Sequence, residues 1–294
     1  MKRDIQPPLG YRSSPDHTTM SFGFSYFRNE GEEGIFLLRS DDARHWKEIN
    51  GGRPVLVPEV GGKLTRDPSV CRGPDGVFHM VWTSSWTDPG FGVAHSTDLL
   101  TWSAQEFVPV NGHEPAAMNT WAPEIFYDEI GKDFLVLWAT TIRGRFPETA
   151  DGGDMNHRIY FSRTRDFVTW TAAELYYDGG FNVIDAVLFR SGGRYGLVVK
   201  DETLRPVAQK NLRVVWSLGG SMGPWDNAGP PFTGAEQGWV EGPSVIHVGD
   251  RWLVYFDQYT QGGYAALETT DFQTFTKAEV SLPKGIRHGT VFRI

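Results

Sequence analysis

Three acidic residues of this chain stand at matching points of a repeated sequence pattern. Asp67, Asp185 and Glu241 each come directly before a short apolar segment, in the fragments RDPSV, VIDAVLF and WVEGPSV. If these segments converge in the fold, the three carboxylates lie close together, which is electrostatically costly and raises the pKa of at least one of them. Hydrolysis of a glycosidic bond uses such groups: one acid protonates the leaving oxygen, and one carboxylate activates water or attacks the sugar.

The segments that carry these acids belong to a longer repeat. A strand, a tight turn rich in Gly and Asp, and a second strand recur at 67–83, 122–140, 184–202 and 241–259. Their flanks are apolar or alternate between apolar and polar residues, as buried and half-buried strands do. A second unit joins an apolar run, Ser or Thr with Asp, and an aromatic residue. Its five copies, two of them weaker, end at Trp46, Trp102, Trp170, Trp225 and Phe275. The four tryptophans recur with the repeat, so we expect them to pack in the core.

The ends of these copies lie 50 to 68 residues apart, which is enough for four antiparallel strands each. Five such units predict an all-β fold, a five-bladed β-propeller with four antiparallel strands per blade. The first copy lacks a strong first strand, and the apolar segment HGTVFRI is left over at the other end of the chain. This last strand could complete the first blade and close the ring. We therefore predict one domain over residues 1–294.

The innermost strand of each blade lines the central channel of a propeller, so equivalent residues of the repeats converge there. When the four strand–turn–strand segments are aligned, Asp67 and Asp185 fall on equivalent positions and Glu241 falls one residue earlier. We therefore expect the three carboxylates to start the innermost strands of blades two, four and five, around one mouth of the channel.

The chain resembles glycoside hydrolase family 43, whose members are five-bladed propellers. The matching fragments, in order and at blade-length spacing, are TRDPSV (65–70), NTWAPEI (119–125), NVIDAVLF (182–189), WVEGPSV (239–245) and RHGTVFRI (287–294). The resemblance covers about residues 20–294 and implies an inverting hydrolase. It implies that Asp67 is the general base, that Asp185 orients the general acid and raises its pKa, and that Glu241 is this general acid. One departure is Ala186, where many members have proline.

The usual substrates of that family imply an exo-acting enzyme that removes terminal pentoses from plant-type oligosaccharides. An α-L-arabinofuranosidase comes first, with a β-xylosidase or exo-β-galactosidase as alternatives, because the residues themselves do not distinguish these sugars. Propeller families that act on fructosides with retention are a further alternative. Their opening Asn-Asp-Pro motif is absent, and the acid here stands in Glu-Gly-Pro rather than Glu-Cys. The non-enzymatic alternative is a carbohydrate-binding propeller, which would not need three converging carboxylates.

Aromatic and polar residues near the acids are candidates for binding the sugar. Trp86 and Trp121 lie where strands are expected to pass into loops, and aromatic rings suit the C–H faces of sugars. Trp239 is a weaker candidate of the same kind. The candidates for hydrogen bonds to sugar hydroxyls are Asn182, Lys200, Gln258 and Arg287. The polar insertion at 145–158 enlarges the third repeat; on the rim of a pocket it would block a through-groove and favour exo action.

Other polar residues are interpreted as structural or accessory. Glu124, in WAPE, is two positions out of phase with Asp67, so we expect it to make hydrogen bonds to a neighbouring blade. Gln237 and Asp257 are interpreted as ordinary polar positions. No cofactor is required for the chemistry. The resemblance implies that His288, near the channel axis, holds a central cation, often calcium, although calcium prefers oxygen ligands.

The composition excludes several classes of protein. The 294 residues carry a net charge of −8 without a basic run, which argues against nucleic acid or an anionic membrane as a partner. No segment approaches about 18 apolar residues, and the start of the chain lacks the apolar core of a secretory signal. A cytoplasmic location is therefore expected unless the chain has been trimmed. The single cysteine, Cys71, lies in an apolar run and is predicted to be a buried, inert thiol. The sequence gives no indication of the oligomeric state.

Overall fold

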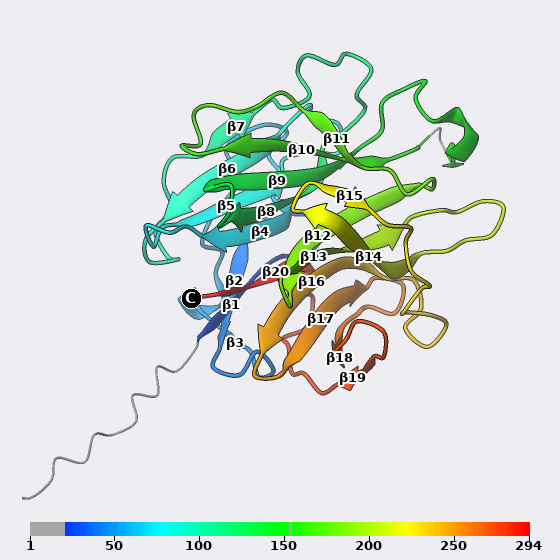
Figure 1. Ribbon diagram of the computed structural model, residues 1–294. Helices are drawn as coiled ribbons and strands as arrows, with labels where there is room; N and C mark the ends of the chain where they lie inside the picture. Colours follow the sequence, from blue (N-terminus) through cyan, green and yellow to red (C-terminus); the bar gives the residue numbers. More distant parts are fainter. Residues whose placement is uncertain (1–20, 153–154) are drawn as a thin grey trace, which may run out of the picture.

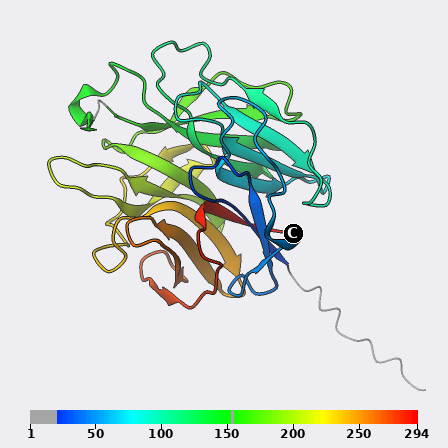
Figure 2. The same ribbon diagram turned by 180° about the vertical axis from the view of Figure 1, so that it is seen from behind.

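Five four-stranded sheets surround a central axis in the computed structural model, which describes residues 21–152 and 155–294 (Figures 1 and 2). Within these residues there is no α-helix, and the short 3-10 helices include η1 (Asn50–Gly52) and η2 (Pro147–Thr149). It follows that no helix in this part of the chain could cross a membrane. The predicted five-bladed β-propeller with four antiparallel strands per blade is confirmed. Residues 1–20 of the predicted single domain lie outside the described residues.

Each blade begins with a strand at the central channel and ends with a short strand at the periphery. Blade one consists of β20 (Arg287–Arg293), β1 (Phe22–Phe27), β2 (Phe36–Ser40) and β3 (Lys47–Glu48). Blade two consists of β4 (Arg66–Arg72), β5 (Phe78–Thr83), β6 (Phe91–Ser96) and β7 (Glu106–Val108). Blade three consists of β8 (Trp121–Asp128), β9 (Asp133–Thr140), β10 (Arg158–Thr164) and β11 (Glu174–Tyr177). Blade four consists of β12 (Val183–Ser191), β13 (Arg194–Asp201), β14 (Asn211–Gly220) and β15 (Gly223–Trp225). Blade five consists of β16 (Glu241–Val248), β17 (Arg251–Gln258), β18 (Gly263–Thr269) and β19 (Thr276–Ala278).

The last strand of the chain closes the ring, as predicted. β20 pairs antiparallel with β1, so that Phe24 lies opposite Val291 and Phe22 opposite Arg293. Five clusters of buried hydrophobic residues then lie between neighbouring blades, one for each pair. The cluster between blades one and five centres on Phe24, whose ring lies 5.7 Å from that of Tyr255 and 5.4 Å from that of Tyr264. The apolar faces of each sheet are thus buried against the next blade.

The repeated Ser/Thr–Asp unit forms the same turn in four blades. In blade two, Asp98 Oδ1 accepts hydrogen bonds from the backbone N–H groups of Leu100 and Thr101, at 2.9 and 2.7 Å. Leu99 between them has a left-handed φ of 67° and buries its side chain. The corresponding buried residues with positive φ in blades one, three and five are Ala43, Phe167 and Phe272. This turn carries the chain into the outermost strand, and the indole of Trp102 donates to the Leu99 carbonyl at 3.2 Å.

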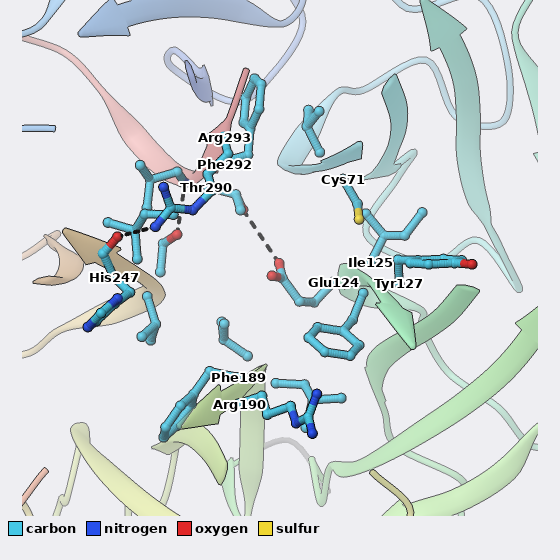
Figure 3. Close-up of a pocket in the computed structure, with 18 of the residues that line it drawn as sticks. Cys71, Glu124, Ile125, Tyr127, Phe189, Arg190, His247, Thr290, Phe292 and Arg293 are labelled. Atoms are coloured by element: carbon cyan, nitrogen blue, oxygen red, sulfur yellow. Dashed lines mark hydrogen bonds between the residues drawn. The ribbon is translucent and has the colours of Figure 1, made fainter. Parts of the chain in front are cut away.

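The channel contains a cavity of about 480 Å³ toward the C-terminal ends of the inner strands. Figure 3 shows Glu124 directed into this cavity, where Thr290 Oγ1 of the closing strand donates to its carboxyl at 3.5 Å. This contact crosses the channel to blade one, whereas the sequence predicted a hydrogen bond to a neighbouring blade, which for Glu124 is blade two or four. Burial raises the pKa of Glu124 to about 7. Cys71 also lines the cavity and is only partly buried, contrary to expectation, because the channel remains open beside it. Its enclosure still raises the thiol pKa to about 12, so the thiol stays protonated.

We expect Phe24→Ala to destabilise the ring at its closure. The side chain is fully buried between two blades, so its removal leaves a cavity and costs about 3–5 kcal/mol of unfolding free energy. Chemical denaturation measures this value. Val168→Ala is the control, because Val168 is 81% exposed and its truncation is expected to change stability by less than about 0.5 kcal/mol. Equal effects of the two substitutions would contradict the closure described here.

Glu124 predicts a pH dependence of stability. Its carboxyl ionises near its usual pKa in the unfolded chain but only at about 7 in the folded one, so the folded state binds more protons between these values. Stability therefore falls as the pH rises through this window, by on the order of 2–4 kcal/mol. Thermal unfolding between pH 4 and 8 measures it, and Glu124→Gln is expected to flatten the profile and to be more stable than the wild type at pH 8. An unchanged profile in this variant would contradict the prediction.

Candidate active site

A bulge at the start of the inner strands places the acids. In β4, β8, β12 and β16 the pairing register shifts by one residue at the same point. The residue there has a left-handed φ in each strand: 50° at Asp67, 47° at Ala122, 54° at Asp185 and 56° at Gly242. The structure thus supports the alignment of the repeats, with Glu241 one residue before the bulge. Such bulges re-aim side chains, and here they bring Asp67 and Asp185 to one place.

His288 lies between Asp67 and Asp185. Its Nδ1 is 3.2 Å from Asp67 Oδ1 and 3.9 Å from Asp185 Oδ2, and Thr83 Oγ1 donates to the other oxygen of Asp67 at 2.8 Å. Burial opposes the ionisation of Asp67, but His288, Arg66 and the Thr83 hydroxyl outweigh it and hold the pKa of Asp67 at about 2. The base predicted from the sequence is therefore a carboxylate at any ordinary pH.

Asp185 behaves in the opposite way. Burial raises its pKa to about 6, against the positive charges of His288 and Lys200, and the negative charge of Glu241 adds to the increase. Asp185 Oδ2 accepts a hydrogen bond of 3.0 Å from the backbone N–H of Gly242, the residue after Glu241. Two carboxyl groups that share one histidine thus have widely different pKa values, which is a feature of acid–base sites.

Glu241 is held between two cations. Arg287 donates to its Oε1 at 2.9 Å, and the Lys200 ammonium lies 3.4 Å from its Oε2. Arg287 also donates to Asp257 at 2.7 Å, and the same Asp257 oxygen accepts from the backbone N–H of His288 at 3.2 Å. Asp257 was interpreted from the sequence as an ordinary polar position, and this was wrong, because it anchors the closing strand at the site. The available signal was the hairpin register, in which Asp257 lies directly opposite Glu241.

The two predicted tryptophan platforms lie side by side. The rings of Trp86 and Trp121 meet edge to face at 5.6 Å, and the Trp121 indole donates to the Trp86 carbonyl at 2.9 Å. Arg66, just before Asp67, stacks its guanidinium 4.1 Å from the Trp86 ring. Trp86 remains 46% exposed, so much of its ring is available to a ligand. Trp239, on the approach to β16, is 40% exposed and lies near Tyr259, with ring centroids 6.5 Å apart.

The predicted hydrogen-bonding residues have different surroundings. Asn182 is buried, and its Oδ1 accepts from the backbone N–H of His157 at 2.9 Å. Gln258, the last residue of β17, donates at 3.0 Å to the carbonyl of Gln237, which lies in the segment before β16. Lys200 and Arg287 both contact Glu241, so these two reach the acids directly. The binding of sugar by all four residues stays a prediction.

The insertion at 145–158 is joined to the next blade. The backbone N–H of Leu204, in the loop after β13, donates to the Asp151 carboxylate. At the end of the insertion, buried Arg158 pairs with Asp178 and donates to the His157 carbonyl at 2.9 Å. The His157 ring lies 4.8 Å from that of Trp121, so the end of the insertion lies beside the predicted platforms. These contacts give blades three and four a common wall.

The surroundings of His288 suit a charged imidazole better than a calcium ligand. Its two acidic neighbours raise the pKa of His288 to about 9 against burial, so the ring itself carries positive charge. Among the described residues no three His, Cys, Asp or Glu side chains are grouped as they would be around a metal. A hydrated calcium in the channel stays a prediction from the resemblance.

The chain has relatives among known glycoside hydrolases. Over 214 residues it is 25% identical to an α-L-arabinofuranosidase of Bifidobacterium longum subsp. longum, a match that covers 65% of this chain but only 20% of that protein. The crystal structure of an α-L-arabinofuranosidase from Lactobacillus brevis is similar with a TM-score of 0.56 and 17% identity, over 74% of this chain and 73% of the other. A thermostable family-43 glycoside hydrolase has a TM-score of 0.60 and 14% identity, over 78% and 76% of the two chains. At these identities the two structures show a shared fold.

The family itself is identified by the sequence. Residues 18–294 match the model of a family described as "Probable glycosyl hydrolase domain", a relative of glycoside hydrolase family 43. The match includes all five blades and every residue of the site described above. The chain therefore belongs to this family of glycosyl hydrolase domains related to glycoside hydrolase family 43.

Proposed function

We propose that this chain is an inverting, exo-acting glycoside hydrolase that removes terminal pentoses from oligosaccharides. The observation that carries the proposal is the convergence of Asp67 and Asp185 on His288 at the channel mouth, with Glu241 directly before the Gly242 amide that donates to Asp185. Asp67 is then ready to take a proton from the attacking water. Glu241 donates a proton to the glycosidic oxygen, and Asp185 orients it through the backbone of Gly242.

The terminal sugar proposed first is α-L-arabinofuranose. The activity named for the curated relative supports it, and that relative is 25% identical over the matched residues. β-Xylose and β-galactose remain the alternatives within the same fold. The wall made by the insertion and the loop after β13 supports exo action, because it bounds the mouth on the side of blades three and four.

A screen of aryl glycosides with the wild type, Asp67→Asn and Glu241→Gln tests this function. We expect the wild type to hydrolyse the α-L-arabinofuranoside, and each substitution to lower kcat/KM by about 10²–10⁴-fold, the usual contribution of a general acid or base. Glu279→Gln is the control, because that side chain is 87% exposed and is expected to leave activity unchanged. Binding of sugars without hydrolysis of any would support the binding-module alternative, and full activity in either variant would remove that residue from its role.

The products of the same reaction test inversion and exo action. NMR during the first turnovers should show a sugar of anomeric configuration opposite to that of the substrate. A linear oligosaccharide should release only monosaccharide at early times. Retention of configuration would contradict the roles of Asp67 and Glu241, and early release of di- or trisaccharides would contradict exo action.

Trp86→Ala tests the aromatic platform. Loss of the exposed ring should raise KM more than it lowers kcat, with kcat/KM reduced roughly tenfold, since stacking on an aromatic ring contributes about a kcal/mol or more. Steady-state kinetics on the best glycoside measures this. Leu218→Ala, which truncates a 66% exposed side chain in β14 of blade four, is the matched control. Equal kinetics for Trp86→Ala and the wild type would show that the ring is not part of the sugar site.

A further inference from the structure

The Lys200 ammonium is shared between two carboxylates. Lys200, in β13, is only 1% exposed. Its Nζ lies 2.7 Å from Glu202 Oε2 and 3.4 Å from Glu241 Oε2, and 4.8 Å from the centre of the Tyr259 ring. A buried cation needs anionic partners, and of the two carboxylates Glu202 is the closer. The Lys200 ammonium therefore lies closer to Glu202 than to the predicted general acid, to which it donates a hydrogen bond.

Glu202 is itself held by a second cation. Its Oε1 accepts from the buried Lys210 ammonium, which lies 5.8 Å from the centre of the Trp239 ring. Glu202 follows β13 directly, so it lies two residues from Lys200 along the chain. The two lysines surround one carboxylate, and this fixes the position of Glu202 and through it the position of the Lys200 ammonium.

This arrangement matters because Glu241 must carry a proton in order to donate it. A nearby cation favours the charged form of a carboxyl group, and Glu241 already accepts a hydrogen bond from Arg287 on its other oxygen. If Lys200 paired fully with Glu241, both oxygens would be held by cations and the protonated form would be disfavoured. A carboxylate that draws Lys200 away counteracts this.

We propose that Glu202 is a positioning residue that shares the Lys200 ammonium and so limits its pairing with Glu241, which leaves Glu241 able to hold the proton that it donates. The inference rests on the proposed role of Glu241 as general acid. Neither Glu202 nor Lys210 was among the residues singled out from the sequence, because the contact with Lys200 depends on side-chain placement around a loop.

The other titratable and charged groups that face Glu241 come from separate elements. They are Arg287 and His288 of β20, Asp257 of β17, Asp185 of β12, Tyr259 after β17 and Tyr264 of β18. Arg287 and His288 favour the charged form of Glu241, and the two aspartates favour the protonated form. A change in the titration of Glu241 on substitution of Glu202 is therefore attributable to Glu202 and Lys200.

The test is a titration of the Glu241 carboxyl followed by ¹³C NMR, with its signal identified by its loss in Glu241→Gln. We expect Glu202→Gln to lower the titration midpoint by about one pH unit, since Lys200 then pairs with Glu241 alone. Lys210→Met should raise the midpoint, because Glu202 is then free to bind Lys200 more tightly. The alkaline limb of the kcat/KM profile should move in the same directions.

A double-mutant cycle separates sharing of the lysine from a simple effect of charge. If Glu202 acts through Lys200, Glu202→Gln made in the Lys200→Met background should shift the midpoint by less than about a third of its effect in the wild type. A full shift in that background, or no shift in the wild-type background, would overturn the proposal. If Glu202→Gln does not fold, a lowered or unchanged midpoint in Lys210→Met overturns it. The midpoint requires no turnover, so lack of hydrolysis by the wild type would instead contradict the proposed function.

Discussion

The pairing of β20 with β1 is the contact on which the rest of the molecule depends. It joins the last strand to the first strand of the described residues, and the buried ring of Phe24 packs across this joint against blade five. An unpaired inner edge would leave blade one incomplete and open to other strands. The same strand also carries Arg287 and His288 to the acids. Closure of the ring is therefore a condition of both stability and the site, because one segment supplies both.

Local backbone strain then places the acids. A left-handed φ in a residue with a side chain costs on the order of 1–2 kcal/mol, and here it occurs at Asp67 and Asp185. Ala122 has the same conformation on an inner strand without an acid at that point. The bulge is thus a property of the inner strand of a blade, which the surrounding sheet enforces. An acid on the bulge is directed to the channel mouth. The fold forms this bulge in four inner strands, and acidic residues occupy it in two of them, at Asp67 and Asp185.

Three of the cations at the mouth each lie between two carboxylates. Their positive charges let several acids approach one another while their protonation differs. The shared cations and their acids are His288 with Asp67 and Asp185, Arg287 with Glu241 and Asp257, and Lys200 with Glu241 and Glu202. The proposed base and acid are Asp67 and Glu241. Each of the three cations also contacts one further carboxyl group, which is Asp185 for His288, Asp257 for Arg287 and Glu202 for Lys200. Because a nearby cation favours the charged form of a carboxyl group, the protonation of Asp67 and Glu241 depends on how closely each cation approaches them rather than its other carboxylate.

The blade repeat, the closing strand and the positions of Asp67, Asp185 and Glu241 could be predicted from the sequence, because these features depend on local patterns. Strand alternation, turn residues and the place of an acid relative to a strand start are all encoded within about ten residues of one another. The partners of these side chains depend on the tertiary structure: Asp257 pairs with Arg287, Glu202 pairs with Lys200, and the Arg66 guanidinium stacks on the Trp86 ring. It also left Cys71 partly exposed to the channel. These outcomes depend on which side chains meet across strands and loops and on how much water reaches them. The spacing of residues along the chain does not predict side-chain contacts or solvent access.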